Sequence, residues 1–440
     1  MIIGFGSAGY SSLMTIKREN PRAEVVIVDP KDYDLMHSCG LPYSIEGLID
    51  EGELYQDIHL NRMGVEKIKA IVEEIDVKKN IIRAVIGDEE VEITYDFAII
   101  ATGSKPLIPQ IKGMNNVYNK GLYSLTSIED LKNIKAGLDK KGAGIVIGAG
   151  SIGLETAIAL KRYLERIVVF EVREHVLPGI VDPDISKTVE EYLISKGIDL
   201  RLNSRVIEVK GENFFEEIIT EDGIIEAGIG ILATGFKANT DLAQKSGIEF
   251  EDNGIIVDSC LKTSIDNIYA AGDCISGWSV IDNRKIPAKL ATSAYKQGRI
   301  AGLNVSGKEE RYRGSTGSFV TKIGDLEVAG VGYNSDTSKN NKFVPISGKI
   351  KMNILPDYFP SNSKIFIKVI LDKKTGKILG AEAVGKYGVV ERINLISMAI
   401  EFNISVGDLA RVELAYCPAV GDVYDPLHRS IDFAIRKIKK

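Results

Sequence analysis

Apolar residues along this chain of 440 residues gather in short runs, and each run is followed or preceded by a stretch that reads as a helix. The runs at 25–28, 143–147 and 167–170 consist almost entirely of Val, Ile, Ala, Gly and Phe. Continuous apolar runs of this length are typical of strands that are buried on both faces of a parallel sheet. Helices are expected at 10–18 and 154–163, so the pattern predicts an α/β fold built from strand–helix–strand units.

The last part of the chain follows a different order. Strands are predicted at 364–371 and 378–384, with a turn at Lys374-Thr375-Gly376 between them, and helices at 389–402 and 424–438. A hairpin followed by helices predicts a separate α+β domain.

Two glycine-rich loops each lie between a predicted strand and a predicted helix. They are Gly4-Phe5-Gly6-Ser7-Ala8-Gly9 and Gly148-Ala149-Gly150-Ser151-Ile152-Gly153. The pattern G-x-G-x-x-G allows a tight turn, close approach of the backbone to a pyrophosphate and close packing of helix on strand. The helix N-terminus then offers unpaired N–H groups and partial positive charge to the phosphates. Only three residues precede the first loop, so two interpretations are open: the native start lies upstream of Met1, or the short strand is held mainly by its neighbours.

An acidic residue ends the strand that follows each helix. Asp29 stands 20 residues beyond Gly9 (29 − 9), and Glu171 stands 18 residues beyond Gly153 (171 − 153). A carboxylate at this spacing can accept hydrogen bonds from a ribose diol. A single glycine loop could serve an ordinary turn, but two complete units predict two dinucleotide sites.

Three more segments end strands in small residues. They are Ala101-Thr102-Gly103, Ala233-Thr234-Gly235 and Gly272-Asp273. Together with the glycine loops, they resemble the pyridine nucleotide-disulfide oxidoreductases over essentially the whole chain. The resemblance implies two Rossmann-like domains, one for FAD and one for NAD(P), the second inserted in the first. The FAD domain is expected at 1–107 and 241–313, the NAD(P) domain at 108–240, and a C-terminal α+β dimerisation domain at 314–440.

The resemblance and the two loops together give the residues expected to bind cofactor. These are Gly4, Gly6, Ser7, Ala8, Gly9, Asp29, Val72, Ala101, Thr102, Gly103, Gly148, Gly150, Ser151, Ile152, Gly153, Glu155, Glu171, Gly235, Gly272, Asp273, Leu290, Ala291 and Thr292. The carboxylate of Glu171 can bind the free 2′-hydroxyl of NADH and would repel the 2′-phosphate of NADPH, so it favours NADH. Arg173 is close enough in sequence to leave NADPH possible.

Cys39 lies in a segment, 36–43, that resembles the redox-cysteine segment of coenzyme A disulfide reductases, NADH oxidases and NADH peroxidases. Dithiol members of the family have a second cysteine five positions later, where this chain has Ser44, so an internal disulfide is excluded. A single cysteine can alternate between thiolate and a mixed disulfide or sulfenic acid. A short helix expected at 43–48 would lower the pKa of the thiol. The alternative is a buried, inert cysteine.

The other three cysteines, Cys260, Cys274 and Cys417, lie far apart without a C-x-x-C pair, so neither a disulfide set nor a metal site is expected. Structural roles are expected for Cys260, in a predicted strand, and for Cys274. Cys417 is ambiguous, because in the family its segment reaches the active site of the partner subunit.

Within the subgroup, oxidases and peroxidases have a histidine where this chain has Ser7. Tyr416 and Tyr358 instead resemble the tyrosines that coenzyme A disulfide reductases place beside the mixed disulfide, where a hydroxyl could act as a general acid. Packing at a dimer interface is the competing explanation. Lys17 and Arg18 resemble basic residues that meet the phosphates of coenzyme A. His37 could polarise the sulfur of Cys39 or simply face solvent.

The net charge of −6 and the pI near 5.6 argue against nucleic-acid binding. No apolar run approaches the roughly 20 residues of a membrane span, so a cytoplasmic protein is expected. The sequence favours an FAD-dependent NAD(P)H:disulfide oxidoreductase, a homodimer by resemblance, that reduces a small disulfide, persulfide or polysulfide. The alternatives are an NADH oxidase that reduces oxygen to hydrogen peroxide or water, and a redox-sensing flavoprotein.

Overall fold

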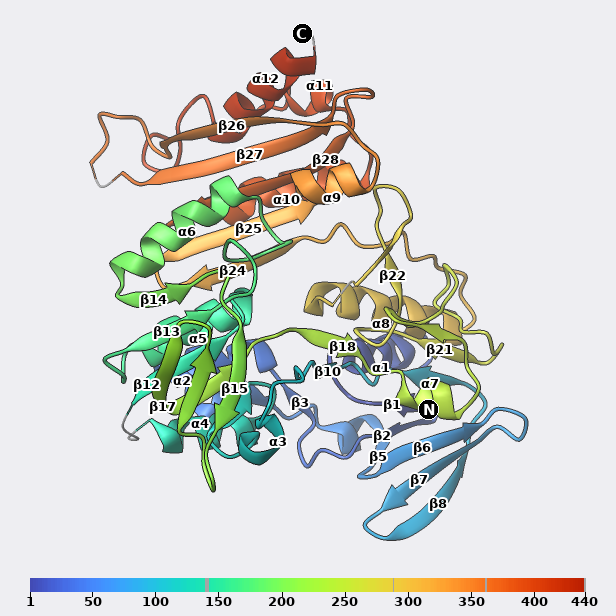
Figure 1. Ribbon diagram of the computed structural model, residues 1–440. Helices are drawn as coiled ribbons and strands as arrows, with labels where there is room; N and C mark the ends of the chain where they lie inside the picture. Colours follow the sequence, from blue (N-terminus) through green and yellow to red (C-terminus); the bar gives the residue numbers. More distant parts are fainter. Residues whose placement is uncertain (139–141, 288, 361, 439–440) are drawn as a thin grey trace. The chain divides into compact units, whose positions relative to one another are not determined.

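The computed structural model describes residues 1–138, 142–287, 289–360 and 362–438 (Figure 1). Contacts divide the chain into two compact units. Unit 1 comprises Met1–Ser38, Asp50–Leu107 and Phe236–Ser315, and unit 2 comprises Cys39–Ile49, Ile108–Gly235 and Thr316–Lys440.

Unit 1 is built on a five-stranded parallel sheet in the order β21-β9-β1-β2-β5. Its strands are β1 (Ile2–Ile3), β2 (Val25–Val28), β5 (Val65–Ile68), β9 (Ala98–Ile100) and β21 (Ile268–Ala270). The two residues of β1 are central in this sheet, because Ile2 is in register with Ile27 on one side and Ile99 on the other. The two residues of β1 thus pair with a strand on each side.

Helices α1 (Ser7–Glu19) and α8 (Ala291–Val305) lie side by side in unit 1 (Figure 1). Their close approach depends on two glycines of α8. A Cβ on Gly298 would lie 2.1 Å from the carbonyl oxygen of Ala8, and one on Gly302 would lie 2.8 Å from that of Ser12. The hydroxyl of Ser12 also donates to the carbonyl of Gly298 at 3.0 Å.

An antiparallel sheet of three strands completes the main elements of unit 1: β6 (Ile71–Asp76), β7 (Ile81–Ile86) and β8 (Glu89–Thr94). The shorter elements of this unit are β3 (Leu35–Met36), η2 (Glu51–Leu54), β4 (Tyr55–Gln56), η3 (Leu60–Met63), β10 (Ser104–Pro106), β18 (Phe236–Ala238), α7 (Asp241–Lys245), β19 (Phe250–Glu251), β20 (Gly254–Ile255), β22 (Gly277–Trp278) and β23 (Lys285–Ile286).

Unit 2 contains a seven-stranded sheet with a parallel core. Its parallel strands are β11 (Leu122–Ser124), β12 (Ala143–Ile147), β13 (Ile167–Phe170), β14 (Ile198–Arg201) and β17 (Gly223–Leu232). Strand β16 (Glu217–Thr220) pairs antiparallel with β17, and β15 (Val206–Lys210) pairs antiparallel with β16. The helices of this part are α3 (Met114–Val117), α4 (Ile128–Gly137), α5 (Ser151–Leu160) and α6 (Pro183–Ser195). Strands β12 and β13 are fully buried, which explains their continuous apolar sequence.

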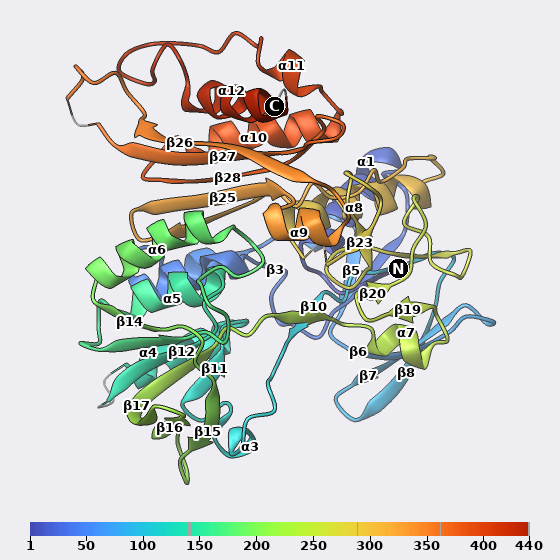
Figure 2. The same ribbon diagram turned by 45° about the horizontal axis from the view of Figure 1, so that its top comes forward.

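The C-terminal part of unit 2 is an antiparallel sheet in the order β24-β25-β28-β27-β26. The strands are β24 (Phe319–Ile323), β25 (Leu326–Gly332), β26 (Pro345–Asn353), β27 (Lys364–Asp372) and β28 (Ile378–Gly385), and the helices are α9 (Ser335–Asn340), α10 (Val389–Glu401), α11 (Val406–Leu409) and α12 (Pro426–Ile438). Helix α12 packs against β26 and β27, and α10 packs against β25 and β28 (Figure 2). The predicted hairpin is β27–β28.

The short helix after Cys39 begins two residues earlier than predicted. A single 3₁₀ turn, η1 (Ser38–Gly40), leads directly into α2 (Leu41–Glu46). Pro42 stands in the first turn of α2, where its fixed φ favours a helix start. Gly47 ends the helix with a left-handed φ of 80°.

A buried charged cluster lies where α6 meets β27 and β28. The ammonium of Lys368 forms ion pairs with Asp182 and with Asp184, the latter at 3.0 Å. Glu382 accepts a hydrogen bond from the backbone N–H of Asp182 at 3.0 Å, and only 2% of its surface is exposed. Oxygens of the three carboxylates lie within 4.8 Å of one another, but the ammonium of Lys368 already pairs with two of them, so we assign no metal. Burial, reinforced by the charge of Asp182, raises the pKa of Glu382 to about 8.

The raised pKa of Glu382 predicts that stability falls as pH rises. The ordinary pKa is 4.5, so between pH 4.5 and about 8 the unfolded chain loses this proton while the folded chain keeps it. Glu382→Gln cannot ionise, and it should be more stable than the wild type at pH 8 by up to about 4 kcal/mol. The thermal midpoint measured from pH 5 to 9 tests this, with the exposed Glu309→Gln as control. Parallel pH profiles for wild type and Glu382→Gln would contradict it.

Candidate functional site

The first glycine loop packs tightly against the carboxyl edge of the sheet in unit 1. Gly4 has a φ of +90°, and a Cβ there would lie 2.5 Å from the carbonyl oxygen of Ala101. A Cβ on Gly9 would lie 2.3 Å from the carbonyl oxygen of Gly4. These distances leave no room for a side chain, so the two glycines fix how closely α1 follows β1.

The second loop repeats this geometry in unit 2. Gly148 has a φ of +107°, and a Cβ there would lie 2.3 Å from the carbonyl oxygen of Ala233. A Cβ on Gly153 would lie 2.1 Å from the carbonyl oxygen of Gly148. Gly235, with a φ of +95°, follows β17 at the same edge. The two loops are thus two copies of one local structure.

Each acidic residue binds the backbone of its own loop. The carboxylate of Asp29 accepts a hydrogen bond from the N–H of Phe5 at 2.6 Å, and that of Glu171 accepts one from the N–H of Ala149 at 2.9 Å. In both cases the donor is the second residue of the loop. A carboxylate has about four acceptor positions, so each acid can still accept a ribose hydroxyl. The sequence motif alone did not reveal this second role.

Three helices begin without a capping side chain at the predicted cofactor residues. Gly6 precedes α1, Gly150 precedes α5 and Leu290 precedes α8, and the first turn of each helix lacks an acidic residue. Helix α4, by contrast, is closed by a capping box of Ser127 and Asp130. Uncapped N–H groups together with the helix dipole provide a site for an anion such as a phosphate. Ala291 and Thr292 are exposed in the first turn of α8.

The side-chain amide of Gln297 lies at the Gly272-Asp273 turn, and the sequence did not predict it. The N–H of Gly272 donates to the side-chain oxygen of Gln297 at 2.8 Å. The amide nitrogen of Gln297 is buried and has no partner within the described part of the chain. Asp273 accepts a hydrogen bond from Ser104 at 3.0 Å, and burial raises the pKa of its carboxyl group. The glycine cradle, the uncapped helices and this unsatisfied amide fit a dinucleotide such as FAD in unit 1.

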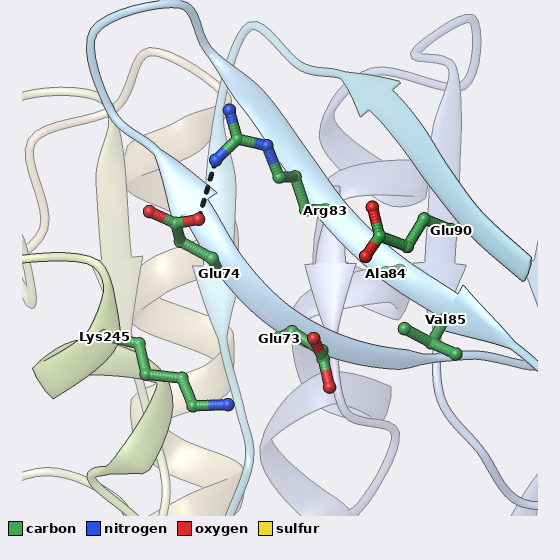
Figure 3. Close-up of a pocket in the computed structure, with 7 residues that line it drawn as sticks. All are labelled: Glu73, Glu74, Arg83, Ala84, Val85, Glu90 and Lys245. Carbon is green, nitrogen blue, oxygen red and sulfur yellow. Dashed lines mark hydrogen bonds and ion pairs between the residues drawn. The ribbon is translucent and has the colours of Figure 1, made fainter. Parts of the chain in front are cut away.

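The remaining predicted cofactor residues occupy nearby loops and strands. Ala101, Thr102 and Gly103 directly follow β9, and Val72 is half-buried on β6 against the core. A cavity of about 340 Å³ adjoins the strands β6 and β7 (Figure 3). Its charged side chains come from Glu73, Glu74, Glu90, Arg83 and Lys245. Since Arg83 pairs with Glu74 at 2.7 Å and the signs are mixed, we do not include this cavity in the site.

Cys39 is exposed in η1 and is not part of a disulfide. The hydroxyl of Tyr43, four residues later, donates to Glu155 of α5 at 3.3 Å. The hydroxyl of the fully buried Ser44 accepts a hydrogen bond from Lys135 of α4 at 3.1 Å. Glu155 was expected among the cofactor-binding residues. Tyr43 ends the predicted redox-cysteine segment but was given no role there, and no motif pointed to Lys135.

The structure brings the two predicted tyrosines together. A hydrogen bond joins the side chains of Tyr358 and Tyr416, and it is the largest cause of a raised pKa at Tyr416. Both rings are exposed, Tyr358 by 74% and Tyr416 by 48%, and Cys417 beside them is exposed as well. The pair can therefore offer a phenolic proton at the surface of unit 2.

Cys274 and Cys260 were both expected to have structural roles. Cys274 is fully buried and its pKa is raised to about 11, as suits a structural residue. Cys260 lies in a turn, not in the predicted strand, because Asp258 accepts its backbone N–H at 2.8 Å.

Lys17 donates to the carbonyl of Ala23 at 2.8 Å, and Arg18 pairs with Glu19 at 3.0 Å. Their place in the last turn of α1 also complements the helix dipole. His37 is exposed, and its backbone N–H donates to Leu54 at 2.8 Å. Roles for these three residues in substrate binding therefore stay predictions. None of the helices in the described ranges combines the length and apolar character required to cross a membrane.

Comparison with known families gives two matches along the chain. Residues 1–298 match the family model described as pyridine nucleotide-disulphide oxidoreductase. Residues 318–425 match the model for the dimerisation domain of the same group.

Similar proteins extend over nearly the whole chain. An NADH oxidase of Methanocaldococcus jannaschii is 34% identical over 451 residues, covering 100% of this chain and 99% of the relative. A CoA-dependent NAD(P)H sulfur oxidoreductase of Pyrococcus furiosus is 30% identical, with 97% of each chain covered. The solved structure of an NAD-dependent persulfide reductase from A. fulgidus has a TM-score of 0.95 at 29% identity, and covers 100% of this chain and 83% of that chain.

The repeated loop geometry predicts that the two nucleotide sites can be damaged separately. Gly9→Ala should lower the FAD content of purified protein severalfold, because its Cβ has no room beside the carbonyl of Gly4. Gly153→Ala should leave the FAD content unchanged and raise the KM for NADH by about tenfold or more. The flavin absorbance per protein and steady-state kinetics measure both effects. Equal loss of FAD in the two variants would contradict the assignment.

Proposed function

The chain belongs to the pyridine nucleotide-disulphide oxidoreductase family, and from that premise we propose that it uses NAD(P)H to reduce a small disulfide, persulfide or polysulfide at Cys39. The observation that carries this proposal is an exposed Cys39 with Ser44 in place of a second cysteine. Such a cysteine must form its disulfide with the substrate.

The residues of unit 1 would hold FAD. Its pyrophosphate fits the N-terminus of α1 between Gly4 and Gly9, and its adenosine ribose fits the carboxylate of Asp29. Asp273 and the first turn of α8 would face the rest of the cofactor. When bound, FAD supplies the capacity to accept a hydride from the nicotinamide and to hold two electrons.

The second loop would hold NADH or NADPH in unit 2. The N-terminus of α5 offers its uncapped N–H groups to the pyrophosphate, and Glu171 offers its carboxylate to the ribose. Glu171 is 8% exposed and already accepts the backbone N–H of Arg173 at 3.0 Å. A buried carboxylate in this place favours NADH over the 2′-phosphate of NADPH.

The chemistry at Cys39 is thiol–disulfide exchange. The thiolate attacks one sulfur of R–S–S–R′, the bond between the two substrate sulfurs breaks, and R′–S⁻ leaves. Cys39 is then in a mixed disulfide with the other half of the substrate. Two electrons from NAD(P)H cleave this bond, which regenerates the thiolate and releases R–S⁻.

The tyrosine pair is suited to donate a hydrogen bond to a departing thiolate. A tyrosine hydroxyl is protonated in neutral solution at its ordinary pKa of about 10, and the interaction with Tyr358 raises the pKa of Tyr416 further, so that hydroxyl remains a donor. We propose that the chain works as a homodimer in which the pair serves Cys39 of the other subunit. The match of residues 318–425 to a dimerisation domain supports this arrangement.

Coenzyme A is the substrate moiety that the comparisons favour. Relatives from two Pyrococcus species are described as CoA-dependent. Lys17 and Arg18 would meet its phosphates, and His37 would lie on the substrate path. We also propose a cytoplasmic location, where cysteines outside disulfides are kept reduced.

Reduction of oxygen is the second candidate function, favoured by the similarity to the NADH oxidase of Methanocaldococcus jannaschii. The helix α1 begins with Ser7, so no imidazole is present there to contact a sulfenic acid. The oxygen reaction would then yield hydrogen peroxide rather than water. A redox-sensing role would instead give tight FAD and slow turnover with every acceptor.

Cys39→Ser should abolish disulfide reduction, with a loss of about 1000-fold or more in kcat/KM. NADH should still bleach the flavin of this variant, because hydride acceptance does not need the sulfur. A steady-state screen under argon with coenzyme A disulfide, coenzyme A persulfide and polysulfide, and under air with oxygen or peroxide, measures both points. Full activity of Cys39→Ser with a sulfur substrate would refute the proposal.

Tyr416→Phe should lower kcat for disulfide reduction by roughly 100-fold, and Tyr358→Phe by less, since a general acid contributes about 100-fold or more. Tyr424→Phe, another exposed tyrosine of the C-terminal segment, serves as control. An unchanged kcat in the double variant Tyr358→Phe/Tyr416→Phe would show that the pair only packs.

A further inference from the structure

The segment that carries Cys39 has little packing of its own. Each residue of η1 (Ser38–Gly40) is at least partly exposed, so burial of η1 itself contributes little to the position of the sulfur. The chain continues without a break into α2, in which Leu41, Pro42, Ser44 and Ile45 are buried. The position of Cys39 therefore depends on how α2 is held.

Two side-chain hydrogen bonds join α2 to its two neighbouring helices. Tyr43 donates its hydroxyl to Glu155 of α5 at 3.3 Å, and Ser44 accepts the ammonium of Lys135 from α4 at 3.1 Å. A third, weaker contact joins Glu46 to Arg162 at 4.0 Å. Helix α2 packs against both α4 and α5, all within unit 2 (Figure 1).

Glu155 is an unusually well-anchored acceptor. It also accepts the hydroxyl of Thr321 at 2.6 Å and the backbone N–H of Lys322 at 3.3 Å, both on β24. Burial raises the pKa of Glu155, and these three donors oppose that rise. The carboxylate of Glu155, on α5, thus forms hydrogen bonds to residues of both α2 and β24.

Tyr43 connects Glu155 to the helix that follows Cys39, so it can affect the orientation of the sulfur. It follows Cys39 by four residues across the junction of η1 and α2, and the two side chains are near enough for the charge of Cys39 to act on Tyr43. Burial, then the charge of Glu155, raise the pKa of Tyr43, and Cys39 contributes in the same direction. The hydroxyl therefore keeps its proton and remains a donor throughout the working pH range.

We propose that Tyr43 is a positioning residue for Cys39. Its hydrogen bond to Glu155 fixes the first turn of α2, and this turn sets the orientation of the Cys39 side chain in η1. This inference rests on the proposed role of Cys39 in disulfide exchange. It assigns Tyr43 no contact with the substrate, only control over the direction from which the thiolate meets it.

The test uses FAD-loaded Tyr43→Phe, which keeps the ring and removes only the hydroxyl. We expect kcat for disulfide reduction to fall by roughly tenfold, because small errors in the aim of a nucleophile are costly. The KM for NADH and the rate of flavin reduction by NADH should stay within about twofold of wild type. The intensity of the thiolate-to-flavin charge-transfer band and the rate at which iodoacetamide alkylates Cys39 should both change.

Two further variants sharpen the result. Thr321→Val removes a donor of Glu155 from the side of β24, and it should move the band and the alkylation rate in the same direction by a smaller amount. Tyr163→Phe is the matched control. The hydroxyl of Tyr163 lies beside Gly47 at the end of α2, whereas in the described part of the chain the hydroxyls bound to Glu155 are those of Tyr43 and Thr321. Tyr163→Phe should match wild type in all measurements.

The outcomes separate this inference from the function on which it rests. If Cys39→Ser is inactive but Tyr43→Phe matches Tyr163→Phe in kcat, band intensity and alkylation, the positioning role is wrong and the function stands. If Cys39→Ser keeps full activity, the function itself fails. A Tyr43→Phe protein that loses FAD or slows flavin reduction as much as disulfide reduction would also overturn the positioning role.

Discussion

The absence of a Cβ at two glycines is the constraint on which both nucleotide sites depend. Carbonyl oxygens lie 2.3 Å and 2.1 Å from where the Cβ atoms of Gly9 and Gly153 would be. This contact sets each helix so close to its strand that the uncapped N-terminus opens at the carboxyl edge of the sheet. Asp29 and Glu171 then hold the loops by their backbone N–H groups, so the acids stabilise the same turn that the glycines permit.

Local patterns along the chain were sufficient to predict the fold class and the nucleotide loops. Glycine spacing within a loop and continuous apolar runs are local patterns, so they can be recognised from a short stretch of sequence. The resemblance also pointed to Tyr358 and Tyr416, whose side chains do meet. The bonds from Tyr43 to Glu155 and from Gly272 to Gln297 were not foreseen, because they join side chains and backbone by tertiary packing that no fixed spacing encodes.

The contacts of the cysteine segment explain why its helix was misplaced by two residues. The prediction started the helix after Pro42, whereas the structure uses Pro42 inside the first turn. Residues 39–49 are grouped by their contacts with the second nucleotide loop and the C-terminal sheet, although they stand in the sequence among residues of unit 1. Cys39 therefore belongs to unit 2, the same compact unit as the loop that would bind the nicotinamide nucleotide.

Ser44 has a chemical consequence for the oxidised form of the protein. Its hydroxyl is buried and bound to Lys135, and it cannot share an oxidised sulfur with Cys39. The two oxidising equivalents held at Cys39 must therefore be stored in a bond to another group, which can be half of a substrate, an oxygen atom or a cysteine outside this segment. The mass of an oxidised molecule of this protein thus identifies the group that Cys39 has bound.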